Sequence, residues 1–256
     1  MEILGRKATR RAALSAAGGG GLLTALTVTA GPAAADTVWE KRRDKAATPP
    51  VHPPLVIRPV VKLGDANEHV KAAQVRLNAL GYWCGASDGS FGSLTQQAVW
   101  ALQKVAHVSR TGKVDDLAWN LLDAGVKGNP RSTSGIVIEC DLAENTLMFV
   151  RDGKLMYTIN TSTGSGERYY SQGEWRTAYT PKGSFSIYYR WTQGWQNGSL
   201  GAMWRPTYFK NSWAIHGSSS IPPYPASHGC CRVSTAAMDK LYAESWTVVG
   251  RKVWIY

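Results

Sequence analysis

The spacing of apolar residues changes once along this 256-residue chain, near residue 130, and this change constrains the fold more than any other feature. Over residues 63–126, apolar residues recur every three or four positions, which is the spacing of one face of an α-helix. Over residues 134–256, they alternate with polar residues, as in β-strands that have one buried face. We therefore predict two domains, a small helical bundle followed by a mostly β domain.

Three helices are predicted in the bundle. The first has a single apolar face made by Val70, Ala73, Leu77 and Leu80. Gly81 ends this helix. A second helix follows the turn DGSFG and has the capping-box spacing from Ser93 to Gln96. A third, short helix begins at Asp115 or Asp116.

The β domain is predicted to be a sandwich with many aromatic residues. Residues 135–164 contain three strand candidates, with Asp152-Gly153 as a hairpin turn between two of them. Further strand candidates are TPKGSFSIYYRW, AMWRPTYF, SWAIHG and RKVWIY. Only STAAMDKLYAES has a helical pattern. The predicted fold class is thus a three-helix bundle followed by a mostly β sandwich with one short helix.

The first 62 residues are predicted to lie outside both domains. Residues 1–35 contain paired Arg10 and Arg11, a Gly-rich apolar run and an Ala-x-Ala site that ends at Ala35. This is the layout of an export signal, here of the twin-arginine type. The apolar run is too short and too rich in Gly and Thr for a stable transmembrane anchor. Residues 36–62 are charged and then Pro-rich, which predicts an extended linker.

The charge favours an anionic partner outside the cytoplasm. The net charge of +11 falls to +8 when residues 1–35, with four basic and one acidic residue, are removed. A basic exported protein suits bacterial cell wall, whereas the absence of a Lys/Arg-rich block argues against nucleic acid. An oxidising compartment also permits disulfides. Cys84 and Cys140 are either an inter-domain disulfide or two buried thiols.

Reactive side chains are concentrated in AIHG and in SHGCCR, residues 227–232. A thiol such as Cys230 becomes an effective nucleophile when a histidine, here His216 or His228, accepts its proton. The glycine before Cys230 lets backbone N–H groups converge on an oxyanion, and a helix start near Ser234 would add a favourable dipole. A zinc site is disfavoured, because neither CxxC nor HxxxH occurs here.

The helical domain resembles the three-helix peptidoglycan-binding domain. The similar segment is LNALGYWCGASDGSFGSLTQQAVWALQKVAHVSRTGKVD, with its Leu-Gly-Tyr, Asp-Gly-x-Phe-Gly, Thr-x-x-Ala-Val and Thr-Gly-x-Val motifs. The resemblance covers nearly all of residues 63–126 and implies a shallow cleft that holds wall peptide or glycan. A spacer role for these helices stays open.

The β domain resembles the catalytic domain of L,D-transpeptidases, the YkuD-like family. The signature is IHGSSSIPPYPASHGCCRVS, and TPKGSFSI is also similar to a family segment. The resemblance implies that Cys230 is the nucleophile and His216 its base. It also implies that the carbonyl of Gly217 orients the His216 ring and that His228 assists beside the thiol.

The resemblance also implies roles for the residues around the nucleophile. Backbone N–H groups of Gly229 and Cys230 would form the oxyanion hole. Arg232 matches the family position that contacts substrate or fixes the loop. Ser227 in the signature and Tyr224, which lies close to the cysteine in sequence, are further candidates for binding substrate. Cys231 stands where the family has Ile or Val, so we expect a packing residue, and a strained disulfide between the two adjacent cysteines is disfavoured.

The implied reaction is acyl transfer without metal or cofactor. The thiolate attacks the carbonyl between a diamino acid and the terminal D-Ala of a stem tetrapeptide, D-Ala leaves, and a thioester forms. The amine of a second stem then gives a 3→3 cross-link, and carbapenems acylate the same cysteine. The expected partners are peptidoglycan stem peptides and glycan, and we expect a monomer. An L,D-carboxypeptidase, another cysteine hydrolase of wall peptides and a non-catalytic wall-binding protein stay open.

Overall fold

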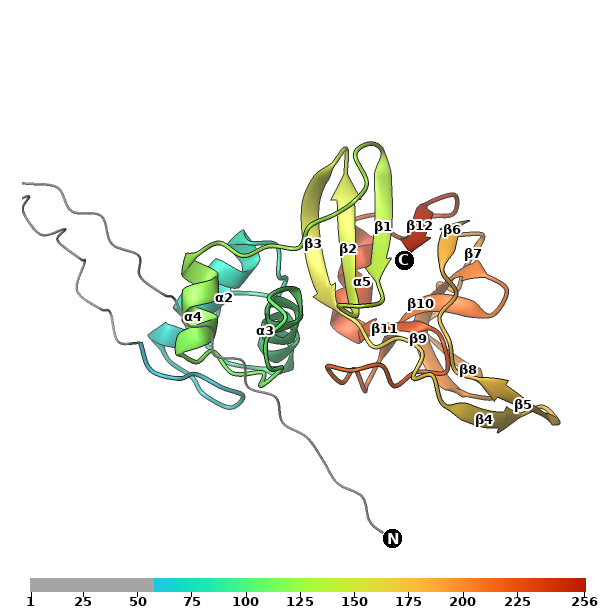
Figure 1. Ribbon diagram of the computed structural model, residues 1–256, viewed down its shortest axis with the longest axis horizontal. Helices are drawn as coiled ribbons and strands as arrows, with labels where there is room; N and C mark the ends of the chain where they lie inside the picture. Colours follow the sequence, from blue (N-terminus) through green and yellow to red (C-terminus); the bar gives the residue numbers. More distant parts are fainter. Residues whose placement is uncertain (1–57) are drawn as a thin grey trace, which may run out of the picture. The chain divides into compact units, whose positions relative to one another are not determined.

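The computed structural model describes residues 58–256, so the predicted export signal and most of the predicted linker lie outside the described residues. Helices α2 (Glu68–Ala79), α3 (Ser93–Val105) and α4 (Asp116–Asp123) come first, and the strands and helix α5 (Thr235–Ala243) follow (Figure 1). This order confirms the predicted fold class. No helix in this part of the chain is long and apolar enough to cross a membrane.

Short polar side chains cap two of the helices α2, α3 and α4. Asn67 caps α2 and Asp115 caps α4, each accepting the backbone N–H three residues ahead. The residue before α3 is Gly92, which has no side chain to make such a bond, and Ser93 is already the first helical residue. The predicted Ser93–Gln96 capping box is therefore wrong, because its first residue lies one position inside the helix.

The helical bundle has an apolar core of its own. Its largest buried members are Leu77, Tyr82, Phe91, Leu102, Trp119 and Leu122. Val61, which the sequence placed in the linker, is also buried there and exchanges two backbone hydrogen bonds with Val114. Residues 58–62 thus belong to the helical unit, because the burial of Val61 is worth about 1.5–3 kcal/mol.

Two five-stranded sheets and one hairpin make up the β domain. The first sheet has the order β3-β2-β1-β12-β6, with strands β1 (Ile136–Asp141), β2 (Thr146–Arg151), β3 (Lys154–Asn160), β6 (Gly183–Ser186) and β12 (Lys252–Ile255). The second has the order β11-β10-β9-β7, with β8 also on β9: β7 (Tyr189–Arg190), β8 (Trp195–Gly198), β9 (Gly201–Lys210), β10 (Trp213–Ser218) and β11 (Cys231–Ser234). The hairpin pairs β4 (Arg168–Ser171) with β5 (Glu174–Thr177).

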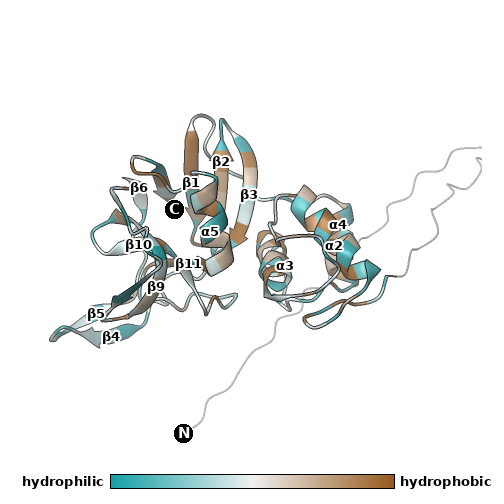
Figure 2. Ribbon diagram, turned by 180° about the vertical axis from the view of Figure 1, so that it is seen from behind, coloured by the Kyte–Doolittle hydropathy of each residue, from teal (hydrophilic) through white to brown (hydrophobic). Residues whose placement is uncertain are grey.

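The two sheets share one core with helix α5. Its buried members include Ile138 and Phe149 of the first sheet, Ile215 and Val233 of the second, and Leu241 of the helix. The hydrophobic colouring on β1 and β2 in Figure 2 marks part of this layer. Five consecutive residues of β2 are buried, because helix α3 also contacts β2 and β3.

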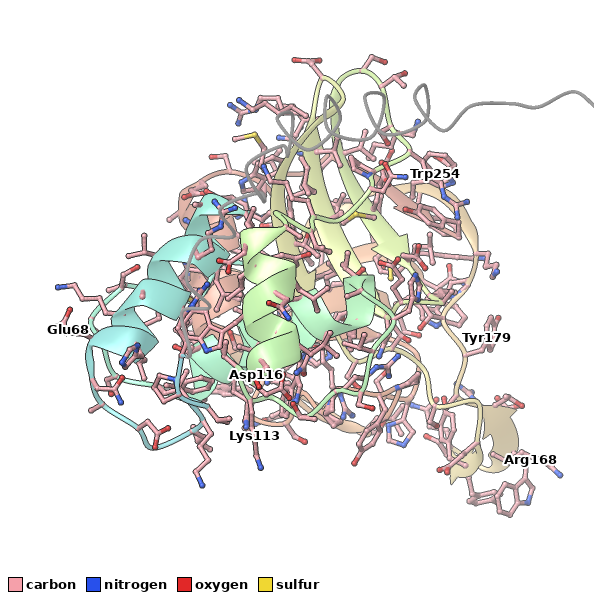
Figure 3. The ribbon with its side chains drawn as sticks, turned by 60° about the vertical axis from the view of Figure 1, so that its left-hand side comes forward. Glu68, Lys113, Asp116, Arg168, Tyr179 and Trp254 are labelled. Carbon is pink, nitrogen blue, oxygen red and sulfur yellow. The ribbon has the colours of Figure 1, made fainter. Side chains whose placement is uncertain are left out.

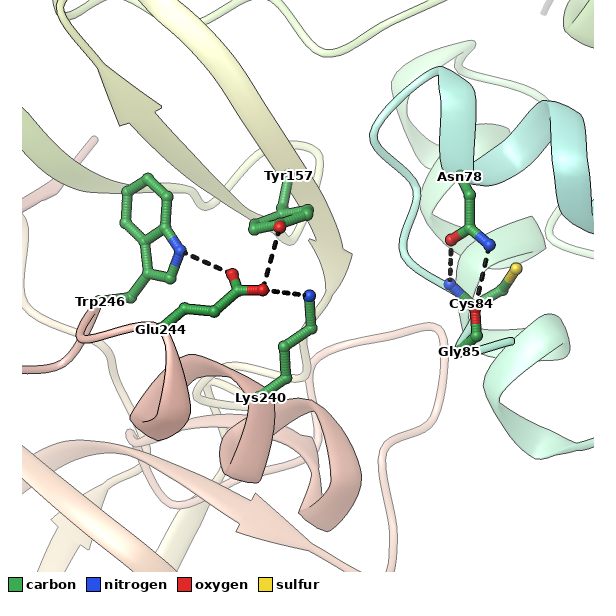
Figure 4. Close-up of polar contacts among 7 residues, drawn as sticks. All are labelled: Asn78, Cys84, Gly85, Tyr157, Lys240, Glu244 and Trp246. Atoms are coloured by element: carbon green, nitrogen blue, oxygen red, sulfur yellow. Dashed lines mark hydrogen bonds and ion pairs between the residues drawn. The ribbon is translucent and has the colours of Figure 1, made fainter. Parts of the chain in front are cut away.

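A network of polar contacts ties the end of helix α5 to strand β3. The carboxylate of Glu244 accepts hydrogen bonds from Tyr157 Oη at 3.3 Å, Lys240 Nζ at 2.5 Å and Trp246 Nε1 at 3.2 Å (Figure 4). The helix that follows the signature is therefore fixed against the first sheet at its C-terminal end.

All four cysteines are free thiols. Cys84 is buried in the helical core, where its backbone N–H donates to Asn78 Oδ1 (Figure 4). Cys140 lies in the β core, and its sulfur neighbour there is Cys231, at 3.8 Å between the two Sγ atoms. Of the two alternatives for Cys84 and Cys140, the structure has the pair of buried thiols.

Candidate active site

Strands β10 and β11 run parallel and side by side, and they carry the two halves of the signature. His216 is paired with Arg232, and Ile215 with Cys231. Because side chains alternate along a strand, one pair faces the cleft and the other faces the core. Cys231 is buried in that core, whereas Cys230, one residue earlier, lines the cleft together with His216 and Arg232. Backbone alternation thus separates the two adjacent cysteines.

The cleft above these strands has a volume of about 690 Å³. Its walls come from hairpin β4–β5, from β8–β9 and from the turn before β11, and they include Tyr169, Arg176, Met203, Tyr208, Trp213 and His228. Tyr179, which also lines the cleft, is labelled in Figure 3, as is Arg168 on the hairpin. The cleft is open to solvent and wide enough for a peptide.

The Cys230 thiol is partly exposed and is held by backbone atoms at the start of β10. Its Sγ atom accepts the N–H of Ala214 at 3.4 Å and donates to the carbonyl of Ser212 at 3.6 Å. Desolvation by burial raises the pKa of Cys230 to about 11, and the N–H of Ala214 opposes the rise. At neutral pH the group is therefore a thiol rather than a thiolate.

The imidazole of His216 has one orientation and one free nitrogen. Its Nδ1 atom donates to the carbonyl of Gly217 at 2.9 Å, since a carbonyl can only accept. This bond leaves Nε2 without a proton and able to accept one. Desolvation by burial lowers the pKa of His216 to about 4, and the positive charge of Arg232 also lowers it. The ring is therefore a neutral base at neutral pH.

The turn before the nucleophile is closed by the Ser227 hydroxyl. Its Oγ atom accepts the N–H of Gly229 at 2.9 Å and donates to the carbonyl of Cys230 at 2.6 Å. The N–H of Cys230 makes no hydrogen bond to a loop or side chain within residues 58–256. Of the two N–H groups considered for an oxyanion hole, that of Gly229 is thus occupied by Ser227, whereas that of Cys230 has no such partner.

Gly229 is held in a conformation that few other residues adopt. Its φ is +137°, and a Cβ atom there would lie 2.6 Å from both the carbonyl oxygen of Tyr179 and Nε1 of Trp213. The carbonyl of Gly229 in turn accepts a hydrogen bond from Thr180 Oγ1 at 2.7 Å. The segment that begins at Thr180 thus fixes the turn from the other side.

Comparison with known proteins agrees with this geometry. The family model for the L,D-transpeptidase catalytic domain matches residues 135–255, and that for the peptidoglycan binding domain matches residues 66–122. The crystal structure of an L,D-transpeptidase (residues 123–326) from Xylanimonas cellulosilytica is 44% identical, covers 80% of this chain and 100% of its own, and has a TM-score of 0.75. This chain belongs to the L,D-transpeptidase family.

Other comparisons are more distant. An L,D-transpeptidase from Stackebrandtia nassauensis is 21% identical and covers 77% of this chain and 94% of its own, with a TM-score of 0.44. No curated protein matches the chain. The catalytic domain and the peptidoglycan-binding domain make this protein an L,D-transpeptidase with peptidoglycan as its partner.

Three further signature residues differ in their access to the cleft of this transpeptidase. His228 is exposed and its ring packs edge-on against Tyr169, with 4.6 Å between the centroids, while burial and then Arg232 lower its pKa. Arg232 lines the cleft from β11. Tyr224 is exposed and does not line the cleft, although its carbonyl accepts a hydrogen bond from Ser162 Oγ.

Sequence reasoning missed the hairpin that forms one wall of the cleft. The segment RYYSQGEWRT carries a hairpin signal in Gln172-Gly173, whose φ angles of +53° and +85° suit a tight turn. It also missed Trp213, whose indole Nε1 donates to the carbonyl of Tyr179 at 2.9 Å. The helix start expected near Ser234 is confirmed, since Ser234 caps helix α5, but the four-residue strand β11 lies between Cys230 and that helix and was not predicted.

Proposed function

We propose that this L,D-transpeptidase forms 3→3 cross-links between peptidoglycan stem peptides through a thioester on Cys230. The observation that carries the proposal is that a partly exposed thiol, Cys230, and a buried imidazole, His216, line the same cleft. The Nδ1 atom of His216 is occupied by a carbonyl, so Nε2 is its only proton acceptor.

In the first step, the thiol proton of Cys230 passes to Nε2 of His216 as sulfur attacks the carbonyl before the terminal D-Ala. Both groups are neutral beforehand, so proton transfer accompanies the attack, which is general base catalysis. The negative charge develops on the carbonyl oxygen, and the N–H of Cys230 is the donor available to it. Collapse of the intermediate releases D-Ala, which takes the proton from His216, and leaves the thioester.

In the second step, the side-chain amine of another stem peptide attacks the thioester carbonyl. His216 accepts a proton from the amine and returns it to the sulfur as the new amide forms and the thiol is released. Water in place of the amine gives a free tripeptide instead, by the same proton transfers. His228 and Arg232 stand at the cleft wall, where they can bind the polar groups of the stem.

The site of action that we propose is the cell wall, outside the cytoplasm. The peptidoglycan-binding domain supports this proposal, because its ligand lies there. The export signal expected at residues 1–35 would take the protein to that compartment.

The experiment that tests the proposal is incubation of the protein with a disaccharide tetrapeptide, followed by mass analysis. A dimer that has lost one D-Ala is the expected product, and Cys230→Ala should give none. Monomeric tripeptide alone would replace the proposal with a carboxypeptidase. An unchanged substrate would contradict both.

A further inference from the structure

The helical domain contacts the loop that joins the two halves of the active site. Residues 219–226 connect strand β10, which carries His216, to the turn that carries Cys230. From helix α3, Gln97 Nε2 donates to the carbonyl of Ile221 at 3.1 Å. A side chain of the peptidoglycan-binding domain thus holds a main-chain atom between the two reactive groups.

Two more contacts fix the same loop. Asn160 Nδ2 at the end of β3 donates to Gln97 Oε1 at 2.5 Å and to the carbonyl of Ile221 at 3.4 Å. Arg110 Nη1 donates to the carbonyl of Pro223 at 2.6 Å. Gln97 therefore uses both ends of its amide, one toward the loop and one toward the strand that flanks it.

A buried lysine of helix α3 reaches the segment on the other side of the site. Lys104 is 2% exposed, and its Nζ atom donates to the carbonyls of Asn145 at 2.8 Å and Thr161 at 2.9 Å. It forms no ion pair within residues 58–256. Thr161 Oγ1 donates to the carbonyl of Arg232, so one hydrogen bond separates the lysine's partner from the cleft wall.

The same lysine supports the catalytic turn by a second route. Asn145 Oδ1 accepts hydrogen bonds from the N–H of Thr163 at 3.2 Å and from its hydroxyl at 2.8 Å. The carbonyl of Thr163 accepts the N–H of Ser227 at 2.9 Å. Ser227 is the residue whose hydroxyl closes the turn before Cys230.

Stability alone does not account for Lys104 at this place. A buried cation without a charged partner costs free energy, and an apolar side chain of the same length would fill the space without that cost. The ammonium instead fixes the positions of the Asn145 and Thr161 carbonyls. Both carbonyls belong to segments whose hydrogen bonds lead to the active site.

We propose that Gln97, Lys104 and Arg110 are positioning residues for acyl transfer, so that the peptidoglycan-binding domain is a structural part of the active site. They act through loop 219–226 and the segment that contacts the turn, and they do not touch substrate. The proposal rests on the proposed function, in that Cys230 and His216 are the groups being positioned.

The test compares Gln97→Met with Gln96→Met in the full chain. Both changes are chemically the same, but Gln96 makes no side-chain hydrogen bond within the described residues. The measurements are the rate constant of Cys230 acylation by imipenem, followed by intact mass, and the melting temperature. Small misplacements of reacting groups lower the rate of a reaction strongly. We therefore expect imipenem to acylate Cys230 about tenfold more slowly, or slower still, in Gln97→Met. Gln96→Met should be acylated at the parental rate. The melting temperatures of both variants should equal that of the parent.

Equal acylation rates in the two variants would overturn the proposal. So would a slow rate in Gln97→Met that is matched by a large fall in melting temperature, since that outcome indicates a merely structural role. With tetrapeptide as substrate, a positioning role lowers kcat and leaves KM unchanged. If the parent forms the imipenem adduct but releases no D-Ala, the proposed function fails while the acylation comparison still decides the positioning role.

Discussion

The Sγ atom of Cys231 lies 3.8 Å from the Sγ atom of Cys140, in the core that the two sheets share and away from the cleft that holds Cys230. Both buried thiols fill space that a small aliphatic side chain could fill. The two neighbouring cysteines of SHGCCR therefore have different surroundings, and they should respond differently to substitution.

Cys230→Ser should abolish the imipenem adduct, whereas Cys231→Val should keep the parental acylation rate to within about twofold, because a swap of similar volume disturbs a core little. Intact mass after a timed incubation measures both. The free energy of unfolding of Cys231→Val should change by less than about 1.5 kcal/mol.

Urea unfolding of each variant is the control for these two substitutions. If Cys231→Val lost activity while its unfolding curve stayed parental, the cysteine pair would have to act as a redox or metal unit. An adduct that persists in Cys230→Ala would remove Cys230 from the mechanism.

The pH dependence of thiol alkylation should show that the Cys230–His216 pair is neutral at rest. Burial raises the pKa of Cys230 to about 11 and lowers that of His216 to about 4. Only the thiolate reacts with iodoacetamide, so the alkylation rate should rise about tenfold per pH unit from neutral pH toward pH 11. Alkylation of Cys230, located by peptide mapping at a series of pH values, measures this.

A plateau in that rate already below pH 7 would show a preformed thiolate–imidazolium pair and contradict the prediction. Acylation by imipenem should behave differently, because it uses His216 as a neutral base. Its rate should hold between about pH 6 and 8 and decline only as the pH falls toward the His216 pKa of about 4.

The fold follows from patterns that are local in the sequence. The apolar face around Leu77 and the Asp152-Gly153 turn depend on neighbours a few residues away, and both elements formed as predicted. The capping box wrongly predicted at Ser93 and the strand β11 that was not predicted show the limit of such local patterns. A four-residue strand has too few residues to show a period, and here it is defined by its pairing with distant strand β10.

The site could be predicted as a set of residue types but not as a set of contacts. His216 and Cys230 were named from their motifs, and Cys231 was expected to pack because it stands where the family has Ile or Val. The bond that occupies the Gly229 N–H, and the reach of Lys104 to Asn145, depend on side chains meeting across the fold. Contacts between residues that are distant in the sequence cannot be predicted from the spacing of residues in a motif.

Gly229→Ala should slow the acylation of Cys230, whereas Gly250→Ala should leave the acylation rate unchanged. The new Cβ at residue 229 would lie 2.6 Å from the Tyr179 carbonyl, whereas at Gly250, also at positive φ, nothing lies within 4 Å. Backbone strain of about 1–3 kcal/mol is common to both, but only the first must move the turn that carries Cys230. We expect at least about a 10²-fold slower imipenem acylation in Gly229→Ala. Equal rates in the two variants would contradict this account of the turn.

Lys104 should make the free energy of unfolding rise with pH, and Lys104→Met should remove this contribution. Burial, followed by the charge of Arg110, lowers the pKa of Lys104 from 10.5 to about 7 in the folded chain. Between these values the unfolded chain binds more protons than the folded chain, so the free energy of unfolding rises with pH. This contribution is complete above about pH 10.5 and is lost as the pH falls through 7.

Urea unfolding of the parent and of Lys104→Met between pH 6 and 10 measures this difference. Other groups titrate in the same range, so the comparison is the difference between the two proteins at each pH. The parent should gain a few kcal/mol relative to Lys104→Met as the pH rises, while at pH 6 the variant should be the more stable protein, because methionine has no charge to desolvate. A difference that stays constant with pH would mean that the ammonium is solvated in the folded chain. If Lys104→Met is at least as stable as the parent at pH 6 and yet is acylated more slowly by imipenem, the lysine positions the active-site segments and does not stabilise the fold.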